Sequence, residues 1–194
     1  MTTIFFDIET GGLRIAQPII QLAAIAVNNG FEELEACEWK LQFSEIECDP
    51  EALLVNHYNA EIWKEKAVPR RLALAEFCSM LERYKDVRMI SKRGSPYYVA
   101  RLAAHNASFD DDRIRYHHKE TLGGFFPAAF NPLCTMQRAL WYFSEHPELR
   151  PPVNYKLGTL CEGFGIEIEG AAHDALTDVR MTIALAKALR GIPS

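Results

Sequence analysis

The sequence lacks several features that would assign it to a familiar class. Its five cysteines are odd in number and are never spaced as Cys-x-x-Cys, which argues against a disulfide framework or a zinc site and favours a reducing cytoplasm. No apolar run reaches the length of a membrane span, and the N-terminus lacks the regions of a signal peptide. We therefore expect a cytoplasmic protein with no membrane partner.

An excess of basic residues is also missing. The net charge is −5 and the isoelectric point is near 5.7, which counts mildly against broad binding along duplex DNA. An enzyme that binds only the end of a strand through metal ions need not be basic. The net charge therefore does not exclude an enzyme of this kind. Because there is no repeat, low-complexity tract or linker, we expect residues 1–194 to form a single domain.

The most informative stretch is the apolar run from Ile4 to Gly12, which carries two carboxylates and ends at paired glycines. In a β-strand, side chains two residues apart share a face, so Asp7 and Glu9 project together. Two like charges among apolar neighbours are costly unless a cation or hydrogen-bond donors compensate them. Taken alone, the pair fits a solvated edge strand equally well.

The flanking segments predict an α/β fold. Residues 19–27 and 36–43 have strand character, and Asn28-Asn29-Gly30 between them is a hairpin signal, so the first half predicts an antiparallel meander. Further strands are predicted at 87–90 and 97–104. Helices are predicted over residues 50–66, 70–84, 108–119, 134–144, 156–164 and 174–189. A meander followed by alternating helices and strands predicts a mixed sheet flanked by helices.

Two further acids occur with histidines at the same spacing. Asp110 lies five residues after His105, and Asp178 lies five residues after His173. Asp174 is a candidate N-cap for the last helix, which leaves His173 in the preceding loop and Asp178 pointing inward. A histidine with an ordinary pKa near 6.5 can accept a proton from water near neutral pH.

Four converging carboxylates require cations. Oxygen ligands suit Mg²⁺ or Mn²⁺, and two such ions about 4 Å apart form the usual arrangement for in-line attack at phosphorus. The predicted ligands are Asp7, Glu9, Asp110 and Asp178.

Three segments resemble the exonuclease motifs of the DEDDh 3′–5′ exonucleases, which belong to the proofreading-exonuclease superfamily. They are Phe6-Asp7-Ile8-Glu9-Thr10, His105 to Asp110 (HNASFD) and His173 to Asp178 (HDALTD), in the family's order across nearly the whole chain. Residues 172–189 look most like the nuclease domain of bacterial exonuclease I. The resemblance implies a ribonuclease H-like fold with a mixed five-stranded sheet, antiparallel first and parallel afterwards.

The resemblance also implies roles for individual residues. Asp7, Glu9, Asp110 and Asp178 would hold two metal ions, and His173 would be the general base. Substrate contacts are implied for a second set, namely Thr10, Gly11, Gly12, Leu13, His57, Asn106 and Phe109.

Three features lie outside these roles. His105 is expected to be a structural histidine. Asp111 and Asp112 are expected on an exposed helix face, and the basic residues that follow them either share that face or contact phosphates. Residues 85–96 are longer and more basic than a minimal family member needs, and they predict either a surface hairpin or a nucleic-acid contact.

The implied function is metal-dependent hydrolysis of phosphodiester bonds from the 3′ end of DNA, with release of nucleoside 5′-monophosphates. Single-stranded DNA is the expected partner. An exoribonuclease of the same fold is the first alternative, and a non-catalytic nucleic-acid-binding module is a second. Such a module should have lost an acidic ligand or the histidine, and all five residues are present here.

Overall fold

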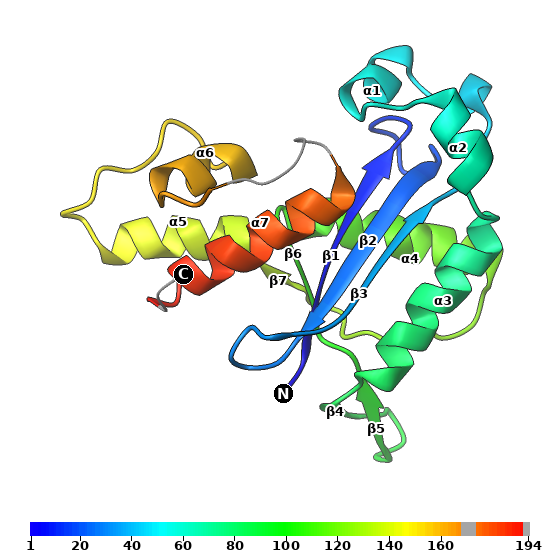
Figure 1. The fold of residues 1–194 in the computed structure, drawn as a ribbon. Helices are drawn as coiled ribbons and strands as arrows, with labels where there is room; N and C mark the ends of the chain where they lie inside the picture. Colours follow the sequence, from blue (N-terminus) through cyan, green and yellow to red (C-terminus); the bar gives the residue numbers. More distant parts are fainter. Residues whose placement is uncertain (168–173, 192–194) are drawn as a thin grey trace.

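A mixed β-sheet runs through the centre of the molecule (Figure 1). The computed structural model describes residues 1–167 and 174–191. The strands lie in the order β3-β2-β1-β6-β7, with bounds Glu33–Lys40, Ile19–Val27, Thr3–Thr10, Leu102–Ala104 and Leu133–Cys134. The β1–β2 and β2–β3 pairs are antiparallel, whereas β1–β6 and β6–β7 are parallel. The predicted five-stranded mixed sheet is therefore confirmed.

Helices cover both faces of this sheet (Figure 1). In chain order they are α1 (Pro50–Val55), α2 (Ala60–Lys66), α3 (Arg70–Arg83), α4 (Ala107–Thr121), α5 (Thr135–Glu145), α6 (Leu157–Gly163) and α7 (Ala175–Ala188), with a short 3₁₀ turn at Glu45–Glu47. Helix α7 packs on one face, and α3 and α4 pack on the other. Among the described residues, no helix is both long and apolar enough to cross a membrane.

Strand β1 is apolar on both faces before its acids begin. Ile4, Phe6 and Ile8 are buried towards α3 and α4, and the Phe6 ring lies 6.0 Å from the ring of Phe77. Phe5 is buried on the opposite face, in the cluster that includes Val179 of α7. Each such side chain contributes about 2 kcal/mol of burial free energy. The strand is therefore anchored on both sides just before it presents Asp7 and Glu9.

The single strand predicted at 97–104 is wrong, because two strands share this range. β5 (Pro96–Val99) pairs with β4 (Val87–Ile90) in a separate two-stranded sheet, and only β6 joins the central sheet. Between them, Ala100 donates from its N–H to the carbonyl of Pro127 and accepts from the N–H of Ala129, both at 2.9 Å. Residues 85–96 thus form a hairpin, which projects at the foot of Figure 1.

The continuous helix predicted over residues 50–66 is also wrong. It is divided into α1 and α2 by residues 56–59, where His57 has a φ of +50°. The Asn59 side chain caps α2 by accepting hydrogen bonds from the N–H groups of Glu61 and Ile62. The third strand lies three residues earlier than predicted, and residue 41 instead bridges to Val68.

The exposed face expected for α4 is likewise wrong for most of its polar residues. Asp111, Arg113, His117 and His118 are all buried. Asp111 accepts from Arg115 at 2.8 Å, and His117 Nε2 lies 3.0 Å from the carbonyl oxygen of Gln17. The Asp111–Arg115 pair lies within one turn of α4, whereas the contact between His117 and Gln17 joins segments 100 residues apart, so helical periodicity alone did not indicate it.

Candidate active site

The end of β1 brings Asp7 and Glu9 to the face that α7 covers. In the antiparallel register Asp7 lies opposite Ala23, and Glu9 lies opposite Gln21. Ala23 is fully buried and packs in the same cluster as Ala175, the first residue of α7. Two small side chains at this position let the start of the helix approach the strand closely.

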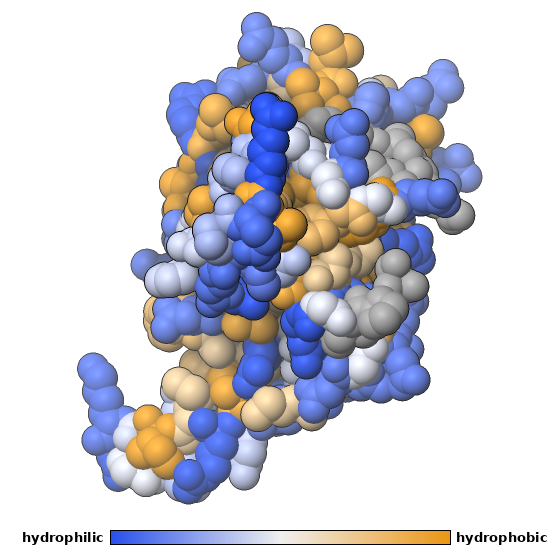
Figure 2. Space-filling model, turned by 90° about the vertical axis from the view of Figure 1, so that its left-hand side faces the viewer, coloured by the Kyte–Doolittle hydropathy of each residue, from blue (hydrophilic) through white to orange (hydrophobic). Residues whose placement is uncertain are grey.

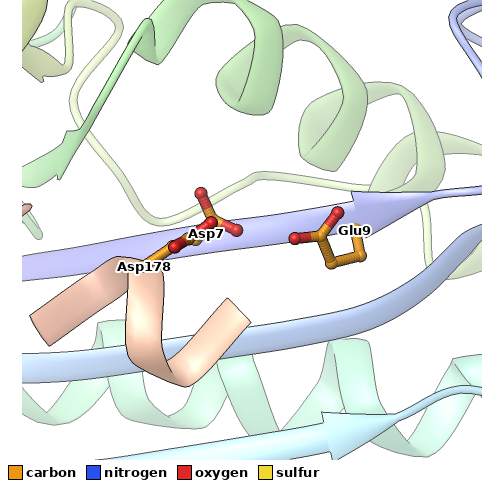
Figure 3. A group of neighbouring side chains, drawn as sticks. All are labelled: Asp7, Glu9 and Asp178. Atoms are coloured by element: carbon orange, nitrogen blue, oxygen red, sulfur yellow. The ribbon is translucent and has the colours of Figure 1, made fainter. Parts of the chain in front are cut away.

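Helix α7 adds the third carboxylate. One carboxylate oxygen from each of Asp7, Glu9 and Asp178 lies within 4.8 Å of the other two. Figure 3 shows Asp178 next to Asp7, with Glu9 farther along the same strand. Three of the four acids named from the sequence therefore lie together in space.

Asp110 approaches from the start of α4. Its Oδ1 accepts a hydrogen bond of 3.3 Å from the N–H of Ile8, midway between the two acids of β1. Asp110 is buried, and its charge raises the pKa values of both Asp7 and Glu9. The structure therefore gathers all four predicted acids around the end of β1, with three of them in the tight group.

Burial and mutual repulsion perturb the protonation of these acids. Burial raises the pKa of Asp7 well above its ordinary value, and the neighbouring carboxylates, Asp110 first, raise it further. Burial, followed by the charges of Asp178 and Asp110, raises the pKa of Glu9 to about 8. Burial also raises the pKa of Asp110 to about 8, against the effect of its hydrogen bond from Ile8. These groups can be ionised together near neutral pH only beside a compensating cation.

The donor set fits a hard divalent cation. The group contains carboxylate oxygens alone, which Mg²⁺ and Mn²⁺ prefer, and it has no thiolate or imidazole among the described residues. A divalent cation bound here would counter both the burial and the mutual repulsion that raise the pKa values of Asp7 and Glu9.

The glycine turn after β1 is held close to the carboxylates. The Thr10 hydroxyl donates to the carbonyl of Gly12 at 2.8 Å, and the Gly11 N–H donates to the carbonyl of Pro18 at 2.8 Å. Gly12 has a φ of +153°, and a Cβ there would lie about 2.3 Å from the side chains of Asp49 and Gln17. Glycine is favoured at this position because other residues rarely adopt this φ, while the ends of the Asp49 and Gln17 side chains would have to move to admit a Cβ.

Other candidate substrate residues border the same region. Leu13 is 80% exposed, and its carbonyl accepts a hydrogen bond from Arg113, whose guanidinium lies 3.4 Å from the ring centre of Phe109. His57 is exposed, next to Asn56, and Asn56 donates from Nδ2 to the carbonyl of Thr10 at 2.9 Å. Thus Asn56 ties the α1 segment to the end of β1, a contact that the sequence analysis missed.

Asn106 and Asp178 line a cavity of about 650 Å³ together with residues of α5, α6 and the loop before α6. His105 stands at its wall, and its two ring nitrogens lie 2.9 Å from the Thr135 hydroxyl and from the carbonyl of Tyr155. Both nitrogens are occupied, as expected of a structural histidine. The predicted base, His173, lies outside the described residues.

Known proteins resemble the chain over nearly its whole length. The family model described as Exonuclease (RNase_T) matches residues 4–186. The chain belongs to this exonuclease family. No curated protein sequence matches it.

Solved exonuclease I structures share the fold of this exonuclease-family chain. The E. coli enzyme in complex with a dT13 oligonucleotide is 23% identical, with a TM-score of 0.74 over 97% of this chain and 41% of that one. Its zinc-bound complex with single-stranded DNA is 22% identical, with a TM-score of 0.76 over 98% of this chain and 40% of that one. The exonuclease I of Methylocaldum szegediense is 20% identical, with a TM-score of 0.74. The match covers 98% of this chain and 40% of that one.

At these identities the likeness establishes the fold and not the substrate. The ribonuclease H-like arrangement implied by the motifs is confirmed. The chain spans about two-fifths of the length of these solved exonucleases.

Gln21, which no sequence motif indicated, links the carboxylate face to α7. Gln21 is buried and donates from Nε2 to Glu38 Oε1 and to Asp174 Oδ1, both at 2.9 Å. Asp174 caps α7 by accepting from the N–H of Thr177 at 3.2 Å. Gln21 therefore fixes the first turn of the helix that carries Asp178. Its only sequence signal is a polar side chain inside the apolar run 19–27.

We expect Gln21→Ala to lower nuclease activity about tenfold while reducing the free energy of unfolding by only about 1 kcal/mol. The loss of this hydrogen bond releases the first turn of α7 and loosens the placement of Asp178. Initial rates, metal affinity by calorimetry and urea denaturation would measure the three effects. Gln42→Ala is the matched control, because its side chain is exposed and, within the described residues, bonds only the carbonyl of Ala67. Equal activity in the two variants would contradict the positioning role.

The raised pKa values predict an unusual dependence of stability on pH for the metal-free protein. Glu9 binds its proton more tightly in the folded state than in the unfolded state, so the free energy of unfolding should fall as the pH rises from about 4.5 to about 8. Glu9→Gln should remove part of the pH dependence of the free energy of unfolding. At pH 8 it should stabilise the metal-free protein by about 2 kcal/mol. Urea denaturation in a chelator at pH 5 and at pH 8 would measure this.

The matched control is Glu65→Gln, which removes an exposed carboxylate on α2. It should leave the profile unchanged. Added Mg²⁺ should stabilise the wild type more at pH 8 than at pH 5. A stability gain from Glu9→Gln that is equal at both pH values would show that carboxylate repulsion is not its cause.

Proposed function

We propose that this chain is a 3′–5′ exonuclease that hydrolyses single-stranded DNA from its 3′ end and releases nucleoside 5′-monophosphates. The observation that carries the proposal is the group of Asp7, Glu9 and Asp178, whose carboxylate oxygens lie within 4.8 Å of one another, with Asp110 hydrogen-bonded beside them. Family membership supports a nuclease, and the oligonucleotide-bound structures of exonuclease I support single-stranded DNA as its substrate.

The four acids would hold two divalent ions, with Asp7 between Asp178 and Glu9 as their shared ligand. Such ions, when bound, activate the attacking water and stabilise the leaving 3′ oxygen. The chain's own contribution is to fix the ligands before substrate binds. Ile8 orients Asp110 through its N–H, and the apolar neighbours of β1 keep Asp7 and Glu9 in register.

His173 is the proposed general base that takes the proton of the attacking water, directly before the N-cap Asp174. The glycine turn and Leu13 would face the terminal nucleotide, and His57, held beside the turn by Asn56, would close over it. Asn106 would support the site, and Phe109 would pack at its side. The five cysteines are unpaired, which supports a reducing, cytoplasmic location.

Two substitutions separate metal binding from proton transfer. We expect Asp7→Asn to weaken metal binding and to lower the hydrolysis rate by at least about 10³-fold, because the shared ligand is lost. His173→Ala should retain most metal binding and lower the rate by about 10²–10⁴-fold. Calorimetry with Mn²⁺ and degradation of labelled oligonucleotides would measure both. Unchanged cleavage in Asp7→Asn would overturn the proposed site.

Substrate and polarity can be tested together. We expect the wild-type enzyme with Mg²⁺ to shorten single-stranded DNA progressively when the 5′ end is labelled, and to release labelled mononucleotide at once when the 3′ end is labelled. Duplex DNA and RNA of matched sequence should be degraded more slowly. Faster degradation of RNA would favour the exoribonuclease alternative, and degradation from the 5′ end would overturn the polarity.

A further inference from the structure

The β4–β5 hairpin concentrates positive charge in an acidic chain. Residues 85–101 carry five basic side chains and one acidic one, whereas the whole chain has a net charge of −5. The basic residues are Lys85, Arg88, Lys92, Arg93 and Arg101, and the acid is Asp86. The hairpin projects from the body of the molecule (Figure 1), so this charge is presented to solvent.

Most of this charge is not neutralised within the chain. Asp86 accepts from the N–H of Thr2 and lies 3.9 Å from the N-terminal amine, so its charge is already engaged. In the part of the chain that the structure describes, Arg88, Lys92 and Arg93 make no ion pair or side-chain hydrogen bond. These three exposed cations are available to an anionic partner.

Aromatic rings are exposed on both sides of the hairpin, and that of Tyr98 lies on the same face as Arg88. Tyr98 is 50% exposed on the outer face of the hairpin, in register with Arg88. Phe125 and Phe130, on the loop that follows α4, are 64% and 80% exposed. A cavity of about 400 Å³ lies between this loop, α4 and the inner face of the hairpin. In Figure 2 the lowest lobe, which is the hairpin, shows hydrophobic atoms among hydrophilic ones.

The exposed loop is tied in place by Arg115. Its guanidinium lies 5.0 Å from the ring centre of Phe130 and 4.8 Å from that of Phe126. The same side chain donates to Asp111 and to the carbonyl of Ala129. Phe130 is therefore held against a cation while most of its surface remains in water.

We propose that the outer face of the β4–β5 hairpin, with Arg88, Tyr98 and the tip cations Lys92 and Arg93, is an accessory binding surface for single-stranded nucleic acid. Unpaired cations and exposed rings together match a strand that presents phosphates and the faces of unpaired bases. A purely apolar protein surface would leave the three cations without partners. The inference rests on the proposed function, because it concerns the segment of substrate on the 5′ side of the end held at the carboxylates.

The accessory surface and the carboxylates lie towards opposite ends of the sheet. The chain from the hairpin enters β6 beside Ile4, near the start of β1, whereas Glu9 lies near the end of that strand. Five residues of strand separate these positions by about 17 Å. A trinucleotide bound at the carboxylates cannot contact the hairpin as well, whereas a strand of about 20 nucleotides is long enough to do so. The surface should therefore matter for long substrates only.

The test uses the full chain with Arg88→Ser and Tyr98→Ser combined. The matched control combines Arg138→Ser with Trp141→Ser on α5, which also removes one guanidinium and one exposed ring. Binding of a strand of about 20 nucleotides is measured by fluorescence anisotropy in a chelator, at several salt concentrations. With Mg²⁺, kcat/KM is measured for the long strand and for a trinucleotide.

We expect the hairpin variant to bind the long strand about tenfold more weakly, with a salt slope lower by about 0.7, while kcat/KM for the trinucleotide is unchanged. The control should match the wild type. Unaltered binding of the long strand, or an equal loss on both substrates, would overturn the inference. If the wild type binds the strand through the hairpin but never hydrolyses it, the proposed function fails and the accessory surface stands.

Discussion

Repulsion among carboxylates at the end of β1 is the constraint on which the rest of the structure depends. The acids are crowded and partly shielded from water, so in the absence of a cation they favour protonation, and Glu9 and Asp110 reach pKa values of about 8. Such an arrangement persists only if the surrounding fold is stable enough to hold it. The first residues of β1, which precede the acids, stabilise this arrangement because their side chains are buried on both faces of the sheet.

Each acid is then fixed by a different kind of contact. Asp7 and Glu9 follow the pleat of the strand, Asp110 accepts from the backbone of Ile8, and α7 is fixed at its N-cap. The contact between Gln21 and Asp174 joins the sheet to that cap, so the second strand of the meander takes part in positioning Asp178. Pre-formed ligands of this kind reduce the rearrangement needed when a metal ion binds.

Charges of opposite sign are concentrated in different parts of the molecule. Negative charge is gathered where cations would be bound, and unpaired positive charge lies on a hairpin at the other end of the sheet. A polyanionic strand would be repelled by the carboxylates alone and attracted by the hairpin. The acidic net charge of the chain therefore does not describe the surface that a nucleic acid would meet.

The sequence by itself determined the type of nearly every element, because the elements depend on local periods of two and 3.6 residues and on an N-cap. Its three motifs, with their four acids, were recognised by their resemblance to those of a known family. It did not indicate that residues 97–104 divide between two sheets, that α4 buries Asp111 and His117, or that Gln21 supports Asp174 across 153 positions. Those features were decided by tertiary structure, because their hydrogen bonds and burial join segments far apart in the chain. A local pattern carries no information about such partners until the sheet has assembled.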